Sequence, residues 1–172
     1  MLKSGSLRHV SPVDQRQFPR KRVLFSGVIT GPECETAIEC IIRDISASGA
    51  QIQIKQAVTL QSPVYLIDTR NEAAHRATVA WAGDRRLGLS FAHSYLLDVG
   101  LANELQFLRT VLVEAKLAQV GRLMKCGLSV EDATSLVGVT EHYIDRFADL
   151  SQNDEKTALL LHQARCLRMR SD

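Results

Sequence analysis

Short apolar runs broken by turn residues make up the first half of the chain. In the run at residues 50–55, Ala50, Ile52 and Ile54 alternate with polar residues, a period of two that is typical of a strand with one buried face. The runs lie at residues 23–30, 37–43, 50–55, 63–68, 75–81 and 87–91. Six short strands with turn residues between them predict a small antiparallel barrel or sandwich.

The hydrophobic period changes near Tyr95. Apolar side chains then recur every three or four residues, which is the period of a helix, at Leu101, Leu105, Leu108, Leu112 and Ala115. We therefore expect a helix over residues 96–125, about 40 Å long. Such a helix carries more apolar surface than one face of a small barrel covers, so we also expect a homo-oligomer formed through residues 96–125.

Start and stop signals divide the rest of the chain into shorter helices. Gly127 and Gly138 are predicted to end helices, and Ser129 and Thr140 to begin them. A last helix is expected over about residues 153–168. The predicted organisation is α+β: a flexible arm at 1–15, a six-stranded barrel at 16–94 and a helical extension at 95–172.

The composition narrows the class of protein. An apolar content of 45% and a charged content of 23% are those of a globular protein. The net charge of +2 is too small to indicate a nucleic-acid or membrane partner. Residues 1–94 carry 12 Lys and Arg against 8 Asp and Glu, whereas residues 95–172 carry 9 against 11. An anionic partner is therefore expected to bind the first half.

The residues typical of metal and catalytic sites are scattered. The four cysteines (Cys34, Cys40, Cys126 and Cys166) form no C-x-x-C pair and no metal-ligand spacing with histidine, which predicts reduced thiols and no metal. The chain has no signal-peptide pattern and no apolar run near the roughly 18 residues that span a bilayer. We expect a soluble, cytoplasmic protein that is not an enzyme and has no cofactor or membrane partner.

A basic cluster precedes the first predicted strand. Arg16 and Arg20 form an R-x-x-x-R spacing, followed by Lys21 and Arg22. Pro19 disfavours helix at the residue before it, so this segment is expected to be extended and able to wrap a ligand. Guanidinium groups bind phosphates through paired hydrogen bonds and also pair with or stack on guanine. A solvated charge run has the same composition.

A second motif, D-x-S-x-x-G, spans residues 44–49 between two predicted strands. Asp44 and Ser46 are residues that cap turns, and Gly49 supplies either a positive φ or room for close backbone approach. An ordinary hairpin turn has this pattern too. In a binding site, Asp44 would accept hydrogen bonds from the guanine N1–H and N2–H groups, with Ser46 left for the other base edge or a phosphate.

Together and in this order, the two motifs resemble the PilZ domain family over about residues 16–94. RVLFSGVI resembles the first strand of that family, and ATVAWAGDRRLGLSF resembles its closing hairpin. The resemblance implies a six-stranded barrel that binds cyclic di-GMP, often as a stacked dimer, without performing chemistry on it. The candidate ligand-binding residues are Arg16, Arg20, Lys21, Arg22, Asp44, Ser46, Gly49 and Trp81.

Two positions qualify this resemblance. Many members carry an arginine immediately before the first motif, and this chain has Gln15 there, which would weaken binding or favour a single nucleotide. Trp81 is the only tryptophan, a residue most often found in a core. In this type of barrel it lies near the wall that faces the ligand, where it could stack on a base.

The C-terminal segment leaves alternatives open. Residues 127–147 weakly resemble a helix-turn-helix, with Gly138 in the turn and Glu141, His142 and Asp145 exposed on the second helix. DNA affinity needs Lys and Arg against phosphates, so a packing unit for self-association or a protein effector is favoured over DNA. We expect a cyclic di-GMP receptor that signals through its helices. The alternatives are a cyclic di-GMP-responsive transcription regulator and a degenerate PilZ module that binds no nucleotide.

Overall fold

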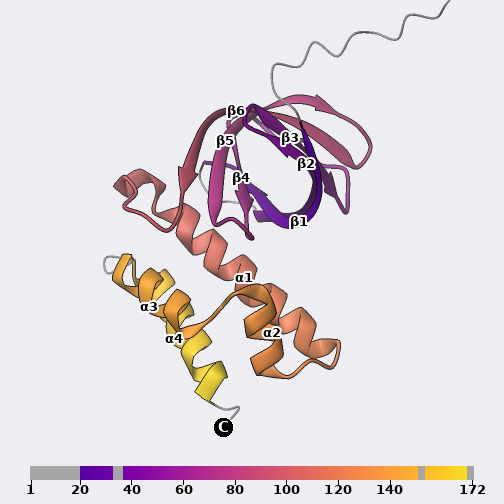
Figure 1. Ribbon diagram of the computed structural model, residues 1–172. Helices are drawn as coiled ribbons and strands as arrows, with labels where there is room; N and C mark the ends of the chain where they lie inside the picture. The colour runs from indigo at the N-terminus through magenta and orange to yellow at the C-terminus, as the bar shows by residue number, and fades with distance from the viewer. Residues whose placement is uncertain (1–19, 33–36, 151–153, 170–172) are drawn as a thin grey trace, which may run out of the picture.

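Six antiparallel strands close into a barrel in the computed structural model, which describes residues 20–32, 37–150 and 154–169. The strands are β1 (Lys21–Thr30), β2 (Ala37–Ser46), β3 (Gly49–Ile54), β4 (Val64–Asp68), β5 (Ala73–Ala82) and β6 (Arg86–Leu96). Around the barrel their order is β1-β2-β3-β6-β5-β4 (Figure 1). The predicted barrel and all six predicted strands are confirmed. Residues 1–15 and Arg16 lie outside the described residues.

The interior of the barrel follows the alternation of the sequence. Ala50 and Ile52 are fully buried and Ile54 nearly so, whereas Gln51 and Gln53 between them face outward. The interior side chains form one apolar cluster with residues of the other strands, among them Ile42, Leu66 and Leu89. Each strand therefore presents its alternate residues to the outside of the barrel.

Four helices follow the strands. They are α1 (Phe107–Lys125), α2 (Val130–Val137), α3 (Glu141–Leu150) and α4 (Glu155–Met169), with a short 3₁₀ turn at Asn103–Leu105 before α1. The predicted signals are confirmed: Ser129 accepts a hydrogen bond from the Asp132 N–H, and Thr140 accepts one from the Tyr143 N–H. Gly127 and Gly138 end their helices with positive φ values of 96° and 78°.

The prediction of a helix starting at residue 96 is wrong. Strand β6 continues to Leu96, which pairs with Ala73, and Leu97 N–H donates to the Glu72 carbonyl. The side chain of Arg109, 1% exposed, then donates to the carbonyls of Leu97 and Val99, acceptors that a helix would have used internally. Residues before Phe107 therefore do not form the predicted helix, because β5 and the buried Arg109 take up their backbone hydrogen bonds.

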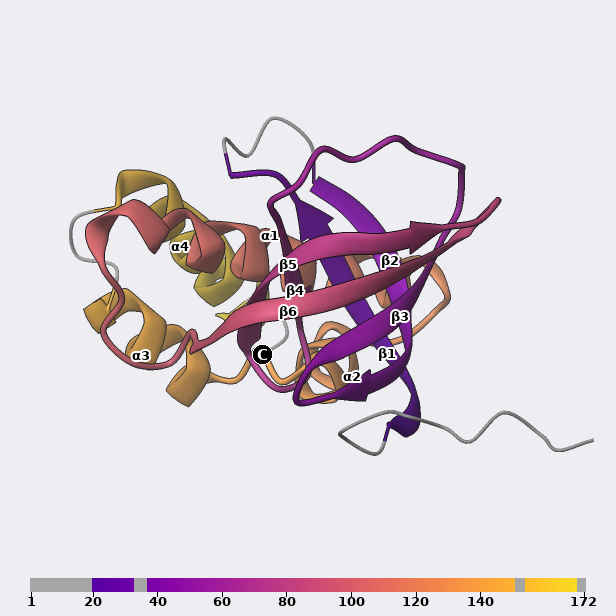
Figure 2. The same ribbon diagram turned by 90° about the horizontal axis from the view of Figure 1, so that it is seen from above.

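The helices gather on one side of the barrel, and α1 packs against the barrel wall (Figures 1 and 2). One apolar cluster contains Val28 and Ile67 of the barrel together with Leu108 and Leu112 of α1 and residues of α2, α3 and α4. Leu108 and Leu112 are fully buried within this single chain, and Leu101 and Leu105 are partly buried against the same cluster. The argument that this stripe needs a second copy is therefore wrong, and self-association through residues 96–125 stays a prediction without that support.

A polar face of α1 also contacts the barrel, at three points one helical turn apart. Lys116 Nζ lies 2.7 Å from a Glu72 carboxylate oxygen, Gln119 donates to Ser26 Oγ at 3.0 Å, and Arg122 pairs with Glu39. Residues three apart on a helix share a face, so the three contacts run from the β4–β5 turn across β1 to β2. No helix in the described part of the chain is long and apolar enough to cross a membrane.

Candidate functional site

The pairing register aligns five residues in a row across the outside of the barrel. Arg22 of β1 pairs with Asp44 of β2, Asp44 with Gln51 of β3, Gln51 with Gly88 of β6, and Gly88 with Trp81 of β5. Directly paired residues in antiparallel strands share a face, and neighbouring strands lie about 4.8 Å apart. We call these five residues the motif row.

Three irregularities in the pairing turn this row outward. Ile42 pairs with Ile52 and Asp44 with Gln51, so β2 advances two residues while β3 advances one. Asp44 would otherwise alternate onto the interior face of Ile42, and the extra residue places it beside the outward-facing Gln51. The same shift lies between Val79 and Trp81 on β5, and another between Arg22 and Phe25 on β1.

The two sequence motifs meet at Asp44. Arg20 Nη1 donates to Asp44 Oδ1 at 2.9 Å, although the two residues are 24 apart in the chain. The side chains are 27% and 16% exposed. The last residue of the first motif therefore lies against the first residue of the second, at the edge of the motif row.

Ser46 and Gly49 close the β2–β3 turn. The Ser46 hydroxyl lies 3.2 Å from the Gly49 carbonyl, to which it donates, and 3.4 Å from the Ser48 hydroxyl. A Cβ atom on Gly49 would lie 2.2 Å from the Leu89 carbonyl oxygen, a contact that no side chain tolerates. Of the two roles open to this glycine, close backbone approach is therefore the one observed, and a positive φ is not.

Trp81 lies over a glycine at the far end of the motif row. A Cβ atom on Gly88 would lie 2.0 Å from Trp81 Nε1, so the indole occupies the space that any other residue at position 88 would fill. Trp81 is 45% exposed. The interpretation of this residue as part of the core is wrong, and a planar aromatic surface is available on the same face as Asp44.

Comparison with known proteins identifies the family of the first half of the chain. The family model described as PilZ domain matches residues 14–99, half of the chain. The chain belongs to the PilZ domain family. PilZ domains are generally non-catalytic receptors for cyclic di-GMP.

Relatives outside the family model are distant. No curated protein matches the chain. Among solved structures it is similar to "Structure of Bacillus subtilis Inhibitor of motility (MotI/DgrA)", with 19% identity and a TM-score of 0.39. The match covers 62% of this chain and spans only 53% of that one.

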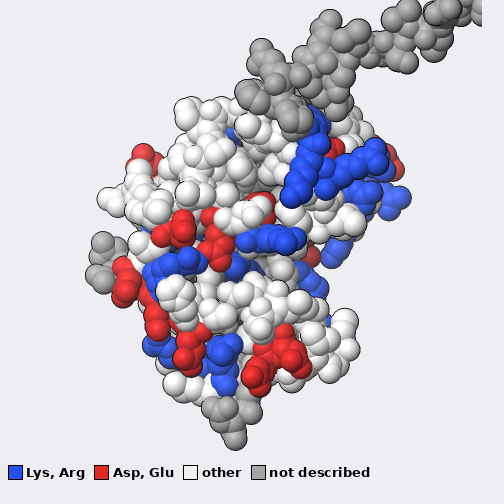
Figure 3. Space-filling model, in the orientation of Figure 1, with Lys and Arg blue, Asp and Glu red and all other residues white. Residues whose placement is uncertain are grey.

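Basic side chains lie in and around the motif row. Lys21 and Arg22 are exposed at the start of β1, and Arg43 and Arg86 are exposed on β2 and β6. Figure 3 shows Lys and Arg gathered on the right of the barrel, whereas the helices below mix both signs. Arg16, the other motif arginine, lies outside the described residues.

Gln51 is the residue of the motif row that the sequence motifs did not predict. It lies between Asp44 and Gly88 and is partly exposed, with an amide that can both donate and accept hydrogen bonds. Nothing in the sequence singles it out from Gln53 two residues later. Only the strand pairing, which places Gln51 opposite Asp44 and Gly88, distinguishes it.

Helix α3, after the PilZ domain, presents an acidic face. In α3 the side chains of Tyr143, Ile144 and Phe147 are buried in the bundle, which leaves Glu141, His142, Asp145 and Asp149 exposed. Asp145 also pairs with Arg165 of α4. A helix with this exposed face lacks the cations that DNA phosphates require. Among the described residues, no group of three His, Cys, Asp or Glu side chains is placed to hold a metal ion.

Proposed function

We propose that this PilZ domain binds cyclic di-GMP across the motif row and passes the binding event to its helices. The observation that carries the proposal is the meeting of Arg20 with Asp44 at 2.9 Å, on the same face as the half-exposed Trp81. The residues join one cation for phosphate, one carboxylate for a guanine edge and one aromatic surface for stacking.

Binding would exchange one ion pair for two ligand contacts. Arg20 donates to a single Asp44 oxygen in the structure. A ligand phosphate offers this guanidinium two acceptors, and a guanine offers Asp44 its N1–H and N2–H donors. A partly exposed ion pair contributes little by itself, so the exchange costs little. The remaining cations, Arg16, Lys21 and Arg22, would close over the phosphates, with Ser46 and Gly49 shaping the floor.

The helices are placed to respond to this exchange. Arg20 immediately precedes β1, and β1 carries Ser26, which accepts the hydrogen bond from Gln119 of α1. A shift of the start of β1 on binding would therefore reach α1 through a short segment of one strand. We expect the readers of this change to be a protein effector or a second copy of the chain, in the bacterial cytoplasm where this messenger acts.

Calorimetric titration with cyclic di-GMP tests the proposal. Arg20→Ala removes a charge-assisted contact and should weaken binding by about 30- to 1000-fold, or about 2–4 kcal/mol. Arg76→Ala is the matched control, since Arg76 is exposed on β5 away from the motif row, and it should bind as the wild type does. Trp81 fluorescence gives an independent signal, because it is the only tryptophan. Wild-type protein that shows neither heat nor a fluorescence change would instead support the degenerate PilZ module.

A further inference from the structure

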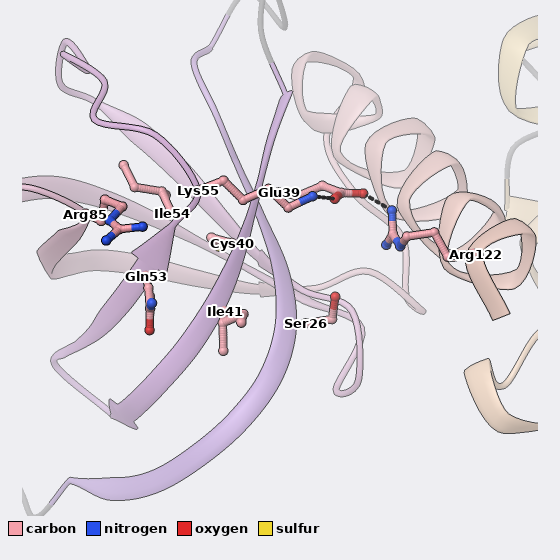
Figure 4. Close-up of a pocket in the computed structure, with 9 residues that line it drawn as sticks. All are labelled: Ser26, Glu39, Cys40, Ile41, Gln53, Ile54, Lys55, Arg85 and Arg122. Carbon is pink, nitrogen blue, oxygen red and sulfur yellow. Dashed lines mark hydrogen bonds and ion pairs between the residues drawn. The ribbon is translucent and has the colours of Figure 1, made fainter. Parts of the chain in front are cut away.

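A hollow lined by both charged and apolar side chains lies beside the motif row, between the barrel and α1 (Figure 4). Its volume is about 500 Å³. Glu39 and Ile41 of β2, Gln53 of β3 and Ser26 of β1 face it, and Arg122 reaches it from α1. Gln53 follows Gln51 of the motif row by two residues, roughly 7 Å along the strand. The hollow therefore adjoins the proposed cyclic di-GMP surface but shares no residue with it.

Cations outnumber anions in this hollow. Lys55, Arg85 and Arg122 line it with a single carboxylate, Glu39. Lys55 Nζ lies 3.3 Å from one Glu39 oxygen, and Arg122 contacts the other. Arg85 lies 3.8 Å from Asp84, which is outside the hollow.

Glu39 occupies the place that an anionic ligand would take. Burial alone would raise the pKa of Glu39, but hydrogen bonds and charge from Arg122 and Lys55 outweigh it and hold the pKa below its ordinary value. Glu39 is therefore a carboxylate at neutral pH, with one cation on each oxygen. Lys55 is 82% exposed, Arg122 46% and Glu39 39%, and pairs this exposed contribute little to stability. A phosphate could take over both cations at small cost.

The rest of the lining suits a ligand with a flat, less polar part. Ile41 is 43% exposed and lies on β2 between Glu39 and the motif row. Gln53 pairs with Ile41 in register and adds an amide beside it. Cys40 is no nucleophile here, because burial raises the pKa of its thiol to about 12. The hollow is suited to binding and not to covalent chemistry.

We infer that this hollow is a second anion site, for a phosphate-bearing mononucleotide whose phosphate replaces Glu39 between Arg122 and Lys55 and whose base lies on Ile41. Occupation separates Arg122 from Glu39, which is one of the contacts between α1 and the barrel. Binding in the hollow would therefore affect α1, as binding at the motif row would, but through the Arg122–Glu39 contact and not through Arg20.

Titration of the full chain with GMP, followed by calorimetry and by amide NMR shifts at Gln53 and Arg122, tests this site. Arg122→Gln should weaken GMP binding by about 10- to 100-fold, because a charge-assisted contact to phosphate is lost. Glu39→Gln should tighten it by about 2- to 10-fold, because the competing carboxylate is gone. Both variants break the same ion pair, so simple loosening of α1 would move both affinities in the same direction.

Two further titrations distinguish binding at this site from binding at the motif row and from binding through the base alone. Arg20→Ala should leave unchanged the GMP affinity measured from the shifts of Gln53 and Arg122, and guanosine, which has no phosphate, should bind there at least 10-fold more weakly than GMP. Loss of these shifts in Arg20→Ala would make them a consequence of GMP bound at the motif row and overturn the second site. The inference also fails if wild-type protein shows no shifts at Gln53 and Arg122 with millimolar GMP, if guanosine binds as well as GMP, or if Arg122→Gln and Glu39→Gln change affinity in the same direction.

Discussion

The motif row and the junction between the barrel and the helices each contain an ion pair, but the two pairs differ in how deeply the cation is buried. At the motif row Arg20 and Asp44 meet at 2.9 Å, and at the junction Lys116 and Glu72 meet at 2.7 Å. Lys116 is only 3% exposed and also lies 4.4 Å from the centre of the Tyr143 ring, while the second oxygen of Glu72 pairs with Arg146 of α3. Arg20 keeps about a quarter of its side chain in solvent.

This difference separates charges that can be exchanged from charges that cannot. A partly exposed pair contributes about 0–1 kcal/mol and is readily replaced by a ligand. A buried pair is costly to break, because the partner left behind is an uncompensated charge in a low dielectric. Distance alone does not distinguish the two regions. Burial and the number of further partners do. The exposed pair supports the proposal that ligand binds at the motif row, whereas the buried pair attaches the helices to the barrel.

The largest effect is expected at the junction. Glu72→Gln leaves Lys116 buried without its carboxylate and should lower the free energy of unfolding by about 3–5 kcal/mol, measured by urea denaturation. Glu104→Gln, an exposed carboxylate in the 3₁₀ turn, is the control and should change it by less than about 0.5 kcal/mol. Cyclic di-GMP affinity of folded Glu72→Gln should match the wild type. A loss of affinity in the folded variant would mean that the two regions are not separate.

At the motif row the expected effect is on binding and specificity. Asp44→Asn keeps the turn but replaces one acceptor oxygen with a donor, so it should weaken cyclic di-GMP binding by about 1.5–3 kcal/mol. Discrimination against cyclic di-AMP should fall at the same time, since the carboxylate is assigned to the guanine edge. Calorimetry with both dinucleotides measures this, with unfolding as the control for stability. An unfolded variant whose remaining folded fraction binds normally would make Asp44 a structural residue.

Trp81 tests how far the motif row extends. If a base stacks on the exposed indole, Trp81→Ala should cost about 1–2 kcal/mol of binding, and Trp81→Phe should retain part of it. Stability should change little, because Trp81 is 45% exposed. Unchanged affinity in Trp81→Ala would confine the ligand to the side of the row that holds Arg20 and Asp44.

The features that the sequence predicted are those decided by neighbouring residues. Ser129, Gly138 and Thr140 act within one helical turn, and their roles follow from their own side chains or from φ. The strands were predicted because short apolar runs between turn residues, with strict alternation at residues 50–55, reflect burial in the barrel. The D-x-S-x-x-G turn was recognised because Asp44, Ser46 and Gly49 lie within six residues of each other.

The features that it missed depend on partners distant in the chain. Whether residues 97–106 are helical is decided by Ala73, Glu72 and Arg109, which no local period records. The outward direction of Asp44 and Trp81 comes from irregular pairing with β3 and β6. Lys116 resembles any surface lysine of a helix until the fold buries it against Glu72.

The smallest expected effect is at the start of α4, where a carboxylate far from the motif row ties two helices together. Asp154 accepts from the N–H groups of Lys156 and Thr157 and from the hydroxyl of Thr110 on α1. Burial alone would raise the pKa of Asp154, but these hydrogen bonds outweigh it and lower the pKa below its ordinary value. A carboxylate whose pKa is lower in the folded state stabilises the fold above its unfolded pKa, near about 4, and that stabilisation is lost as the pH falls through the folded value.

Asp154→Ala should therefore lower the free energy of unfolding by about 1 kcal/mol at pH 7, the usual cost of removing a helix cap. The difference from the wild type should shrink as the pH is lowered below about 4, because the wild-type carboxyl is then protonated as well. Urea denaturation at several pH values measures this, with the exposed Asp149→Asn in α3 as control. Cyclic di-GMP affinity at pH 7 should be unchanged, because the hydrogen bonds of Asp154 described above go to Thr110, Lys156 and Thr157, none of which belongs to the motif row. A difference that stays constant with pH would show that the contacts of Asp154 do not depend on its charge.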